Sequence, residues 1–345
     1  MEKLKEYAKL LPGFGVALLI AAVAKWLESL LPIHLIGASV IALFIGMLIN
    51  HFIKPSALLA GGLKFTSKKI LKFAIILLGA SLSIGTILQV GKLSLMVMIF
   101  TLLNCFGGGY FIGKALGLNW KLSNLISAGT GICGGSAIAA IAPVIDAEDR
   151  DIAYAMSATF VFDMAMIVLF PIMGRALGLS DMAYGLWAGT AVNDTSSVVA
   201  AGYAFSEGAG DFATMVKLTR TLSIIPTVII FALIEVHLKK KAAKANGAGE
   251  NVKANVKVSK IFPWFILGFI AMAIINSVGV IPVEVSSGAK TLINLLMVDA
   301  LAAIGLNTSF KDMKKSGIMP MVHGFIISAL VVVVAIGVEY CMGIV

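Results

Sequence analysis

Charged residues are scarce in this chain of 345 residues: Lys, Arg, Asp and Glu together make up 13%, whereas hydrophobic residues make up 59%. One globular core cannot bury that much apolar surface, so the composition excludes a soluble protein. Acidic residues are the rarer sign, 18 against 27 basic ones, which leaves a net charge of +9. The basic residues lie between apolar runs and not on one face, so membrane topology explains them better than nucleic-acid binding does.

Cysteines are few, and the common catalytic motifs are missing. Cys105, Cys133 and Cys341 lie in separate apolar runs without the spacing of a metal site. The sequence has no H-E-x-x-H, no G-x-S-x-G, no phosphate-binding G-x-x-x-x-G-K-S/T and no dinucleotide-binding motif. We therefore expect no enzymatic activity, no metal centre and no cofactor apart from Na⁺ as a coupling ion.

Apolar runs of about 20 residues, the length that crosses a bilayer, recur through the chain. They predict an all-α polytopic membrane protein with about eleven transmembrane helices, at 12–31, 33–53, 69–90, 93–117, 121–145, 151–178, 182–204, 212–238, 261–281, 287–309 and 318–343. Basic connections, including those with Lys54, Lys121 and Arg175, alternate with acidic ones. The positive-inside rule then places the N-terminus in the cytoplasm.

One long polar stretch, 239–260, has the sequence KKKAAKANGAGENVKANVKVSK. Its low complexity and charge predict a flexible basic linker in the cytoplasm. The linker divides a single integral membrane unit into a first part, 1–238, and a last part, 261–345, with three transmembrane helices.

A polar, glycine-rich motif occurs twice, each time inside an apolar run. Residues 128–140 are AGTGICGGSAIAA and residues 188–200 are AGTAVNDTSSVVA, with five of thirteen positions identical. Unwound backbone at membrane depth is tolerated where it lines a polar cavity, and paired helix breaks indicate the substrate site of a secondary transporter. Close packing of small residues is the alternative, but it does not explain Asn193-Asp194-Thr195 in the second copy.

Loop charges allow two topologies for these discontinuous segments. Either all eleven segments cross and the two copies run parallel, or nine cross and the copies form two re-entrant hairpins that enter from opposite sides. A weaker similarity between GASLSIGT at 79–86 and DALAAIGLNT at 299–308 is a further indication of internal, inverted repeats. Gly109, Gly113 and Gly117 recur every four residues, which predicts a face for close helix packing.

Five ionisable residues inside the apolar runs need an explanation, because each costs about 2.5–3.5 kcal/mol at a helix centre. They are Asp163, Asp194, Asp299, Lys217 and Arg220. Lys217 and Arg220 are three residues apart and share a helix face, and the planar guanidinium suits carboxylate, sulfonate or phosphate oxygens. They predict an anion site, with a structural ion pair to Asp194 or Asp163 as the alternative.

Three acids against two bases leave one carboxylate to bind Na⁺ or carry a proton. Asp194 is the first choice because its Asn, Thr and Ser neighbours supply oxygen ligands, and Asp163 and Asp299 are the other candidates. The substrate site is expected to combine both motifs with the basic pair. Its residues are Gly129, Thr130, Cys133, Gly134, Gly135, Ser136, Asn193, Asp194, Thr195, Ser196, Lys217 and Arg220.

Three stretches in this order resemble the YeiH-type sulfate exporter family: GTGICGGS at 129–136, GTAVND with VVAAG between 189 and 202, and KLTR at 217–220 with Pro226. The resemblance implies a bacterial or archaeal inner-membrane secondary transporter for sulfate or related small anions. Some relatives have His-Glu where this chain has Asn193-Asp194.

More distantly, CGGS at 133–136 followed by Asp163 and Pro171 is similar to the bile-acid sodium symporter superfamily. This similarity implies inverted repeats, two crossing discontinuous helices and an elevator-type movement of a core domain against a panel.

These observations together predict a secondary active transporter of a small anion, coupled to Na⁺ or H⁺. A cation/proton antiporter, in which the acids bind the transported ion, is the first alternative, and a passive channel is the second. The expected partners are the anion and the lipid bilayer, with homo-oligomerisation left open and nucleic acid excluded.

Overall fold

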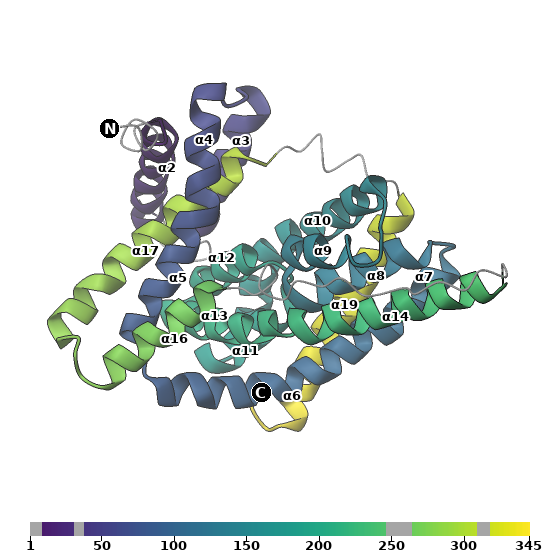
Figure 1. Cartoon of the computed structure of the whole chain (residues 1–345). Coiled ribbons are helices and arrows are strands. Elements are labelled where there is room, and N and C mark those ends of the chain that lie inside the picture. Colours follow the sequence, from purple (N-terminus) through teal and green to yellow (C-terminus); the bar gives the residue numbers. More distant parts are fainter. Residues whose placement is uncertain (1–8, 31–37, 246–263, 309–317) are drawn as a thin grey trace.

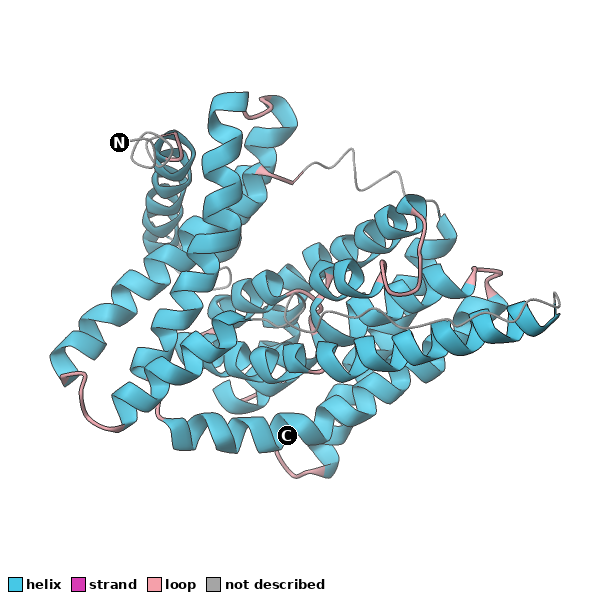
Figure 2. Ribbon diagram, viewed as in Figure 1, coloured by secondary structure: helices cyan, strands magenta, loops and turns pink. Residues whose placement is uncertain are grey.

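The computed structural model describes residues 9–30, 38–245, 264–308 and 318–345. These residues form helices and short connections, with no strand among them, as Figure 2 shows. The predicted all-α class is therefore confirmed for the described chain. Residues 239–245 of the predicted linker continue the helix α14 (Ile224–Ala245), and residues 246–260 lie outside the described residues.

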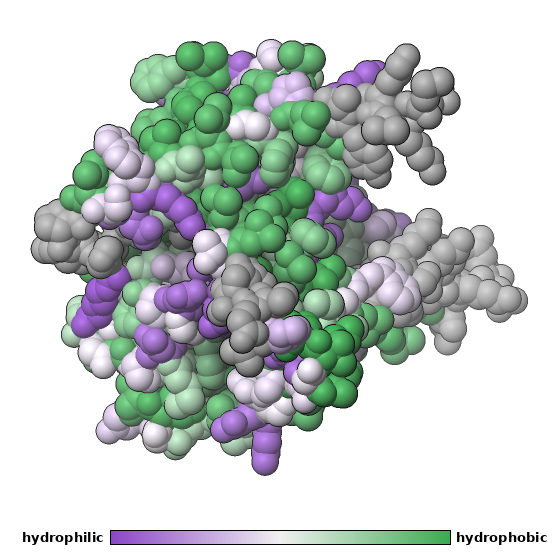
Figure 3. Space-filling view, turned by 90° about the vertical axis from the view of Figure 1, so that its left-hand side faces the viewer, coloured by the Kyte–Doolittle hydropathy of each residue, from purple (hydrophilic) through white to green (hydrophobic). Residues whose placement is uncertain are grey.

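Among the described residues, five helical runs are long and apolar enough to cross a membrane. They are α2 (Leu11–Leu30), the continuous run of α6 (Ile84–Leu103), η3 (Asn104–Gly108) and α7 (Gly109–Ala115), α10 (Asp149–Ala176), the run of α13 (Glu207–Leu222) into α14, and α19 (Ile318–Cys341). Large apolar side chains such as Phe52 and Phe111 are exposed on the surface, and apolar residues cover much of the face in Figure 3. This is the surface of a multi-pass membrane protein.

The predicted span 69–90 is wrong, because the structure places a turn inside it. One helical segment contains α4 (Ala57–Phe65), η1 (Thr66–Ile70), α5 (Leu71–Leu78) and η2 (Gly79–Ser81), and the chain turns at Leu82 and Ser83 before α6. The Ser83 hydroxyl accepts a hydrogen bond from the Thr86 backbone N–H at 3.1 Å and so caps α6. The turn lies in a short stretch of small and hydroxyl residues between two strongly apolar runs, so a hydropathy window of about 20 residues did not reveal it.

The helices form two groups that are visible in Figure 1. One group, which we call the panel, contains α2, α3 (Ala38–Phe52), the segment α4 to η2, α16 (Trp264–Ser277) and α17 (Val283–Leu306). The other, which we call the bundle, contains α6 to α14 and α19. The main contacts between the two groups run from α12 (Thr195–Phe205) to α3 and α17, and from α16 to α6.

Two of the three glycines spaced at four residues make the close contacts that the pattern predicts. A Cβ atom at Gly109 would lie 2.1 Å from Ser127 Oγ, and one at Gly113 would lie 2.1 Å from Ser123 Oγ, both on α8 (Trp120–Ala128). Gly117, with φ of 68° and no neighbour within 4 Å, follows the end of α7. The helices α7 and α8 can therefore approach closely only because the first two positions lack a side chain.

Candidate functional site

The first glycine-rich segment is a helical hairpin, which we call hairpin A. It runs through α8, η4 (Gly129–Cys133) and α9 (Gly135–Ile141). Its two ends lie side by side, since Lys121 Nζ donates to the Asp146 carbonyl at 2.7 Å. Asn119 Nδ2 also donates to the Asp151 carboxylate at 3.1 Å. The chain reverses at Gly134, whose φ of 64° and ψ of −136° suit glycine alone.

The second segment is also a hairpin, hairpin B, made of α11 (Asp181–Ala191) and α12. Ser206 Oγ at its end donates to Asp181 Oδ1 at its beginning, at 2.7 Å. The Tyr184 hydroxyl donates to the Ala201 carbonyl across the hairpin at 2.9 Å, and the Tyr184 and Phe205 rings stack with their centroids 4.0 Å apart. The tip, residues 192–194, is non-helical.

Helix α10 shows that the hairpins enter from opposite ends of the bundle. Asp151, at the start of α10, contacts the beginning of hairpin A. Arg175, near its end, donates to the Ala204 and Phe205 carbonyls of hairpin B at 2.9 and 3.2 Å. Of the two arrangements that the sequence left open, the structure therefore has opposed hairpins. Arg175 consequently lies at the opposite end from Lys121, although the sequence grouped both with the basic connections.

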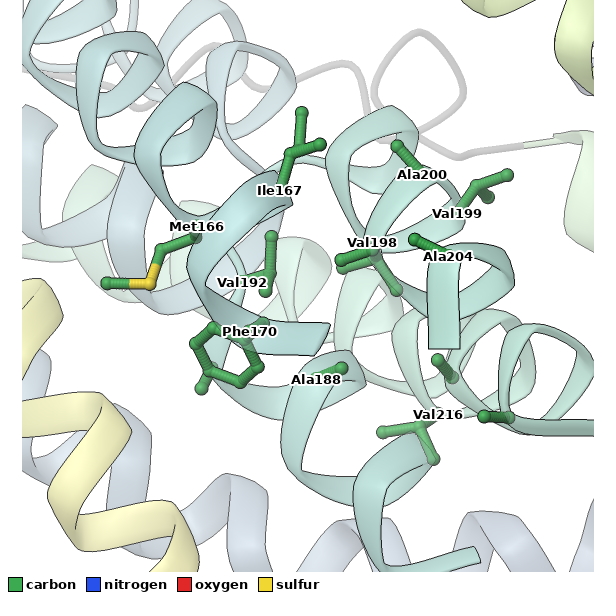
Figure 4. Packing of buried hydrophobic residues seen from close by; sticks show 14 of the residues in the cluster. Met166, Ile167, Phe170, Ala188, Val192, Val198, Val199, Ala200, Ala204 and Val216 are labelled. Atoms are coloured by element: carbon green, nitrogen blue, oxygen red, sulfur yellow. The ribbon is translucent and has the colours of Figure 1, made fainter. Parts of the chain in front are cut away.

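The two tips meet halfway along α10. We call residues 129–134 of hairpin A tip A and residues 192–194 of hairpin B tip B. A Cβ atom at Gly134 would lie 2.9 Å from Asp194 Cβ, so the close approach of the two tips requires glycine at this position. Asp194 is the N-cap of α12, where its carboxylate accepts from the Ser196 backbone N–H at 2.9 Å and from the Ser196 hydroxyl. Apolar side chains hold hairpin B against α10 and α13, as Figure 4 shows for Met166, Ile167, Phe170, Ala188, Val192, Val198, Val199, Ala200, Ala204 and Val216.

Asp163, from the middle of α10, anchors tip B through both of its carboxylate oxygens. Oδ1 accepts from the Asn193 backbone N–H at 3.0 Å, and Oδ2 accepts from the Asp194 backbone N–H at 3.2 Å. The side chain is buried. Charge-assisted hydrogen bonds of this kind are stronger than neutral ones, so Asp163 fixes the tip to α10.

Arg220 and Lys217, on α13, join the two tips and do not face a cavity. Arg220 Nε donates to the Gly131 carbonyl at 2.7 Å and Nη2 to the Thr130 carbonyl at 2.6 Å, both on tip A. On tip B, the Val192 carbonyl accepts from Lys217 Nζ at 2.9 Å and from Arg220 Nη1 at 3.3 Å. These carbonyls lie where helices break and lack intrahelical donors, so the basic pair compensates the polar backbone of both breaks.

The sequence analysis missed a serine and an acid on α19. Ser328 Oγ lies 3.4 Å from Thr130 Oγ1 of tip A and 3.5 Å from Asn193 Nδ2 of tip B. Glu339 is fully buried, and neither of its carboxylate oxygens has a hydrogen-bond partner among the residues that the structure describes. Its position inside the apolar run 318–343 was the available signal.

Asp299 is on a different group of helices from the tips. It lies on α17 of the panel, fully buried, and within the described part of the chain neither carboxylate oxygen has a hydrogen-bond partner. The structure thus brings Asp163 and Asp194 together at the hairpin tips but does not place Asp299 with them.

A cavity of about 1400 Å³ lies between the hairpin tips and the panel. Five of the predicted substrate-site residues line it, namely Cys133, Ser136, Asp194, Thr195 and Ser196. The other seven, Gly129, Thr130, Gly134, Gly135, Asn193, Lys217 and Arg220, are not part of its wall.

The panel contributes a basic wall to the same cavity. Lys68, Lys69 and Lys72, from η1 and α5, line it. The sequence analysis placed none of them in the site, because Lys68 directly precedes the predicted run 69–90, and Lys69 and Lys72 lie at its beginning. Val144, Trp264 and Thr308 also line the cavity. It therefore extends toward the end of the molecule at which α9 of the bundle ends and α16 of the panel begins.

Comparisons with known proteins place the chain among bacterial membrane proteins. The family model described as "Conserved hypothetical protein 698" matches residues 12–324. A "UPF0324 membrane protein" of Clostridium tetani is 57% identical over 334 residues, 96% of this chain and 97% of the relative. One of Streptococcus mutans is 39% identical over 342 residues, 97% and 98% of the two chains. A solved sodium proton antiporter from Methanocaldococcus jannaschii covers 98% of both chains, but its 14% identity and TM-score of 0.30 carry no inference.

Proposed function

The chain belongs to the YeiH-type family of membrane proteins, and we propose that it is a secondary active transporter of a small anion, sulfate or sulfonate-like, coupled to Na⁺ or H⁺. The observation that carries this proposal is the meeting of two opposed hairpin tips halfway along α10, beside a large cavity. In membrane transporters, broken helices near the bilayer midplane form substrate and coupling-ion sites.

The opposed hairpins support a topology of nine crossing segments and two re-entrant hairpins. Each hairpin begins and ends at one end of α10, so it returns to the side from which it enters. The two copies of the motif are then related as inverted repeats. In this topology the N-terminus and the mouth of the cavity are cytoplasmic, and the C-terminus lies outside.

The charge of the cavity wall favours an anion over a cation. Lys68, Lys69 and Lys72 face one acid, Asp194, among the described residues that line it. One observation favours the alternative of a cation/proton antiporter: Asp194 and Asp163 lie together at the tips. The Asp163 carboxylate is already occupied by two backbone N–H groups, however, which leaves Asp194 as the single acid in the wall for a coupling ion.

The division into panel and bundle supports an elevator-type mechanism. Both tips belong to the bundle, where Arg220 and Asp163 tie them to α13 and α10. The bundle would therefore carry the tips and the bound anion as one body past the panel. A passive channel is disfavoured because the two tips are closed against each other where they meet. Arg220 donates hydrogen bonds to both tips, and Gly134 contacts Asp194.

Transport by the purified full-length protein in proteoliposomes tests the proposal. We expect saturable uptake of radiolabelled sulfate that internal sulfate accelerates and that a Na⁺ or pH gradient drives. If sulfate, sulfonates and small carboxylates are neither transported nor thermally stabilising, while Na⁺ or pH shifts the melting temperature, the protein is a cation antiporter. Flux without saturation or exchange would identify a channel.

A further inference from the structure

Three lysines form a basic strip along one side of the cavity, which we call the lysine wall. Lys68 and Lys69 lie on η1, and Lys72 follows on α5. Lys72 comes four residues after Lys68 and three after Lys69, and both spacings place its side chain beside theirs on the helix surface. All three are exposed and line the cavity. The Lys72 Nζ atom lies 5.4 Å from the centroid of the Phe265 ring, also in the cavity wall.

The positive charge of the lysine wall is not compensated within the part of the chain that the structure describes. None of the three ammonium groups pairs with a carboxylate there, and Lys68 and Lys69 repel Lys72. Like charges at these spacings destabilise a helix. A cleft lined by one sign of charge, however, concentrates counter-ions of the opposite sign.

Membrane topology alone does not explain where these lysines point. The positive-inside rule asks only for basic residues near this end of the protein. Lys64, one turn before Lys68 on the same helical segment, is equally exposed but does not line the cavity. The three lysines that follow it all do.

Hydroxyl groups across the cavity complete a set of donors for oxygen atoms. Thr195, at the start of α12 in hairpin B, and Ser136 of hairpin A line the wall opposite the panel. Ammonium and hydroxyl groups are donors that suit an oxyanion. The cavity thus offers charge from the panel and neutral donors from the bundle.

We propose that Lys68, Lys69 and Lys72 receive a free small oxyanion in the cavity and hold it opposite the hydroxyls of Thr195 and Ser136. The inference rests on the proposed transport of an anion and names the residues that attract it. Because the lysines belong to the panel and the hydroxyls to the bundle, the lysine wall raises the local anion concentration at the mouth, whereas the tips carry the anion across.

Sulfate binding to the purified full-length protein in detergent tests this assignment, with calorimetry as the measurement and sodium chloride as the ionic-strength control. We compare the wild type with the triple variant Lys68→Gln, Lys69→Gln, Lys72→Gln. The matched control is Lys64→Gln, which removes one charge from the same segment outside the cavity. We expect the triple variant to weaken sulfate binding by about tenfold or more, the lower end of electrostatic focusing, and the control to bind as the wild type does.

The result that would overturn the lysine wall is unchanged sulfate affinity in a triple variant that elutes from size-exclusion chromatography as the wild type does; the transport proposal would then stand. If the triple variant fails to fold, Lys72→Gln alone takes its place, with a smaller loss expected. Stabilisation by phosphatidylglycerol that the triple variant loses, with equal sulfate binding in both proteins, would assign the lysines to lipid and also overturn the inference. A wild type that binds and transports no oxyanion refutes the proposed function itself.

Discussion

Replacing Arg220 with lysine separates charge from geometry where the two hairpins meet. The guanidinium binds the Thr130 and Gly131 carbonyls of tip A and the Val192 carbonyl of tip B. A lysine ammonium has a single nitrogen on a flexible stem and cannot reproduce this planar set of donors. The two carbonyls on tip A must then share a single nitrogen, or one or both of them lose their donor.

The expected cost follows from the number of buried acceptors left without a partner. Each costs about 1–3 kcal/mol, so loss of one or two gives roughly 1–6 kcal/mol of destabilisation. For a long chain, 1 kcal/mol lowers the melting temperature by about 2 °C or less. We therefore expect Arg220→Lys to melt roughly 2–12 °C below the wild type and to transport poorly even though the charge is kept.

Thermal unfolding followed by tryptophan fluorescence measures this directly, because Trp187 is buried in hairpin B and donates to the Val332 carbonyl at 2.9 Å. Thr219→Ala is the matched control, since the hydroxyl of Thr219 bonds only within α13, to the Met215 carbonyl. A melting curve for Arg220→Lys that coincides with that of the control would refute the role of Arg220 in joining the tips.

Three further predictions address the tips and the unpaired acid. Gly134→Ala should reduce transport and stability by about 1–3 kcal/mol or more, since φ and ψ there suit glycine, whereas Gly135→Ala, with no neighbour within 4 Å, should behave as the wild type; equal loss in both would contradict this. Asp194→Asn should keep the cap on α12 and retain sulfate exchange, but lose accumulation driven by Na⁺ or pH; normal accumulation in proteoliposomes would exclude Asp194 as the coupling group. Glu339→Met should raise the unfolding free energy by about 1–3 kcal/mol, because a buried carboxyl without a partner is removed; a lower melting temperature would indicate that Glu339 has a stabilising role.

The sequence predicted the helical class and the location of both helix breaks, because glycine and hydroxyl residues interrupt otherwise apolar runs. It could not decide whether these segments cross or return, since both arrangements satisfy most loop charges. Arg175 could not help in that test, because its guanidinium donates to the carbonyls at the end of hairpin B, at the opposite end of α10 from hairpin A. The turn at Leu82 was missed because its small and hydroxyl residues form only a short stretch between two strongly apolar runs.

The candidate site was predicted in part for a similar reason. The shared face of Lys217 and Arg220 was recognised, but a sequence contains no sign of which backbone carbonyls a broken helix leaves open. Their observed partners are main-chain atoms of Thr130, Gly131 and Val192. That Lys217 and Arg220 also contact an anion stays a prediction. Lys72 was not assigned to the site because the predicted run began at residue 69. In the structure one helical segment continues from α4 through η1 into α5, so Lys68, Lys69 and Lys72 lie along the same segment.

The long sequence separation between Arg220 and the tip it secures has a consequence for biosynthesis. The residues whose carbonyls it binds, Gly131 and Thr130, precede it by 89 and 90 positions. At roughly 5–20 residues per second of translation, hairpin A leaves the ribosome several seconds before its stabilising side chain exists. Hairpin A therefore reaches the translocon while the carbonyls of its tip still lack the side chain that binds them. It acquires its final shape only when α13 is inserted beside it.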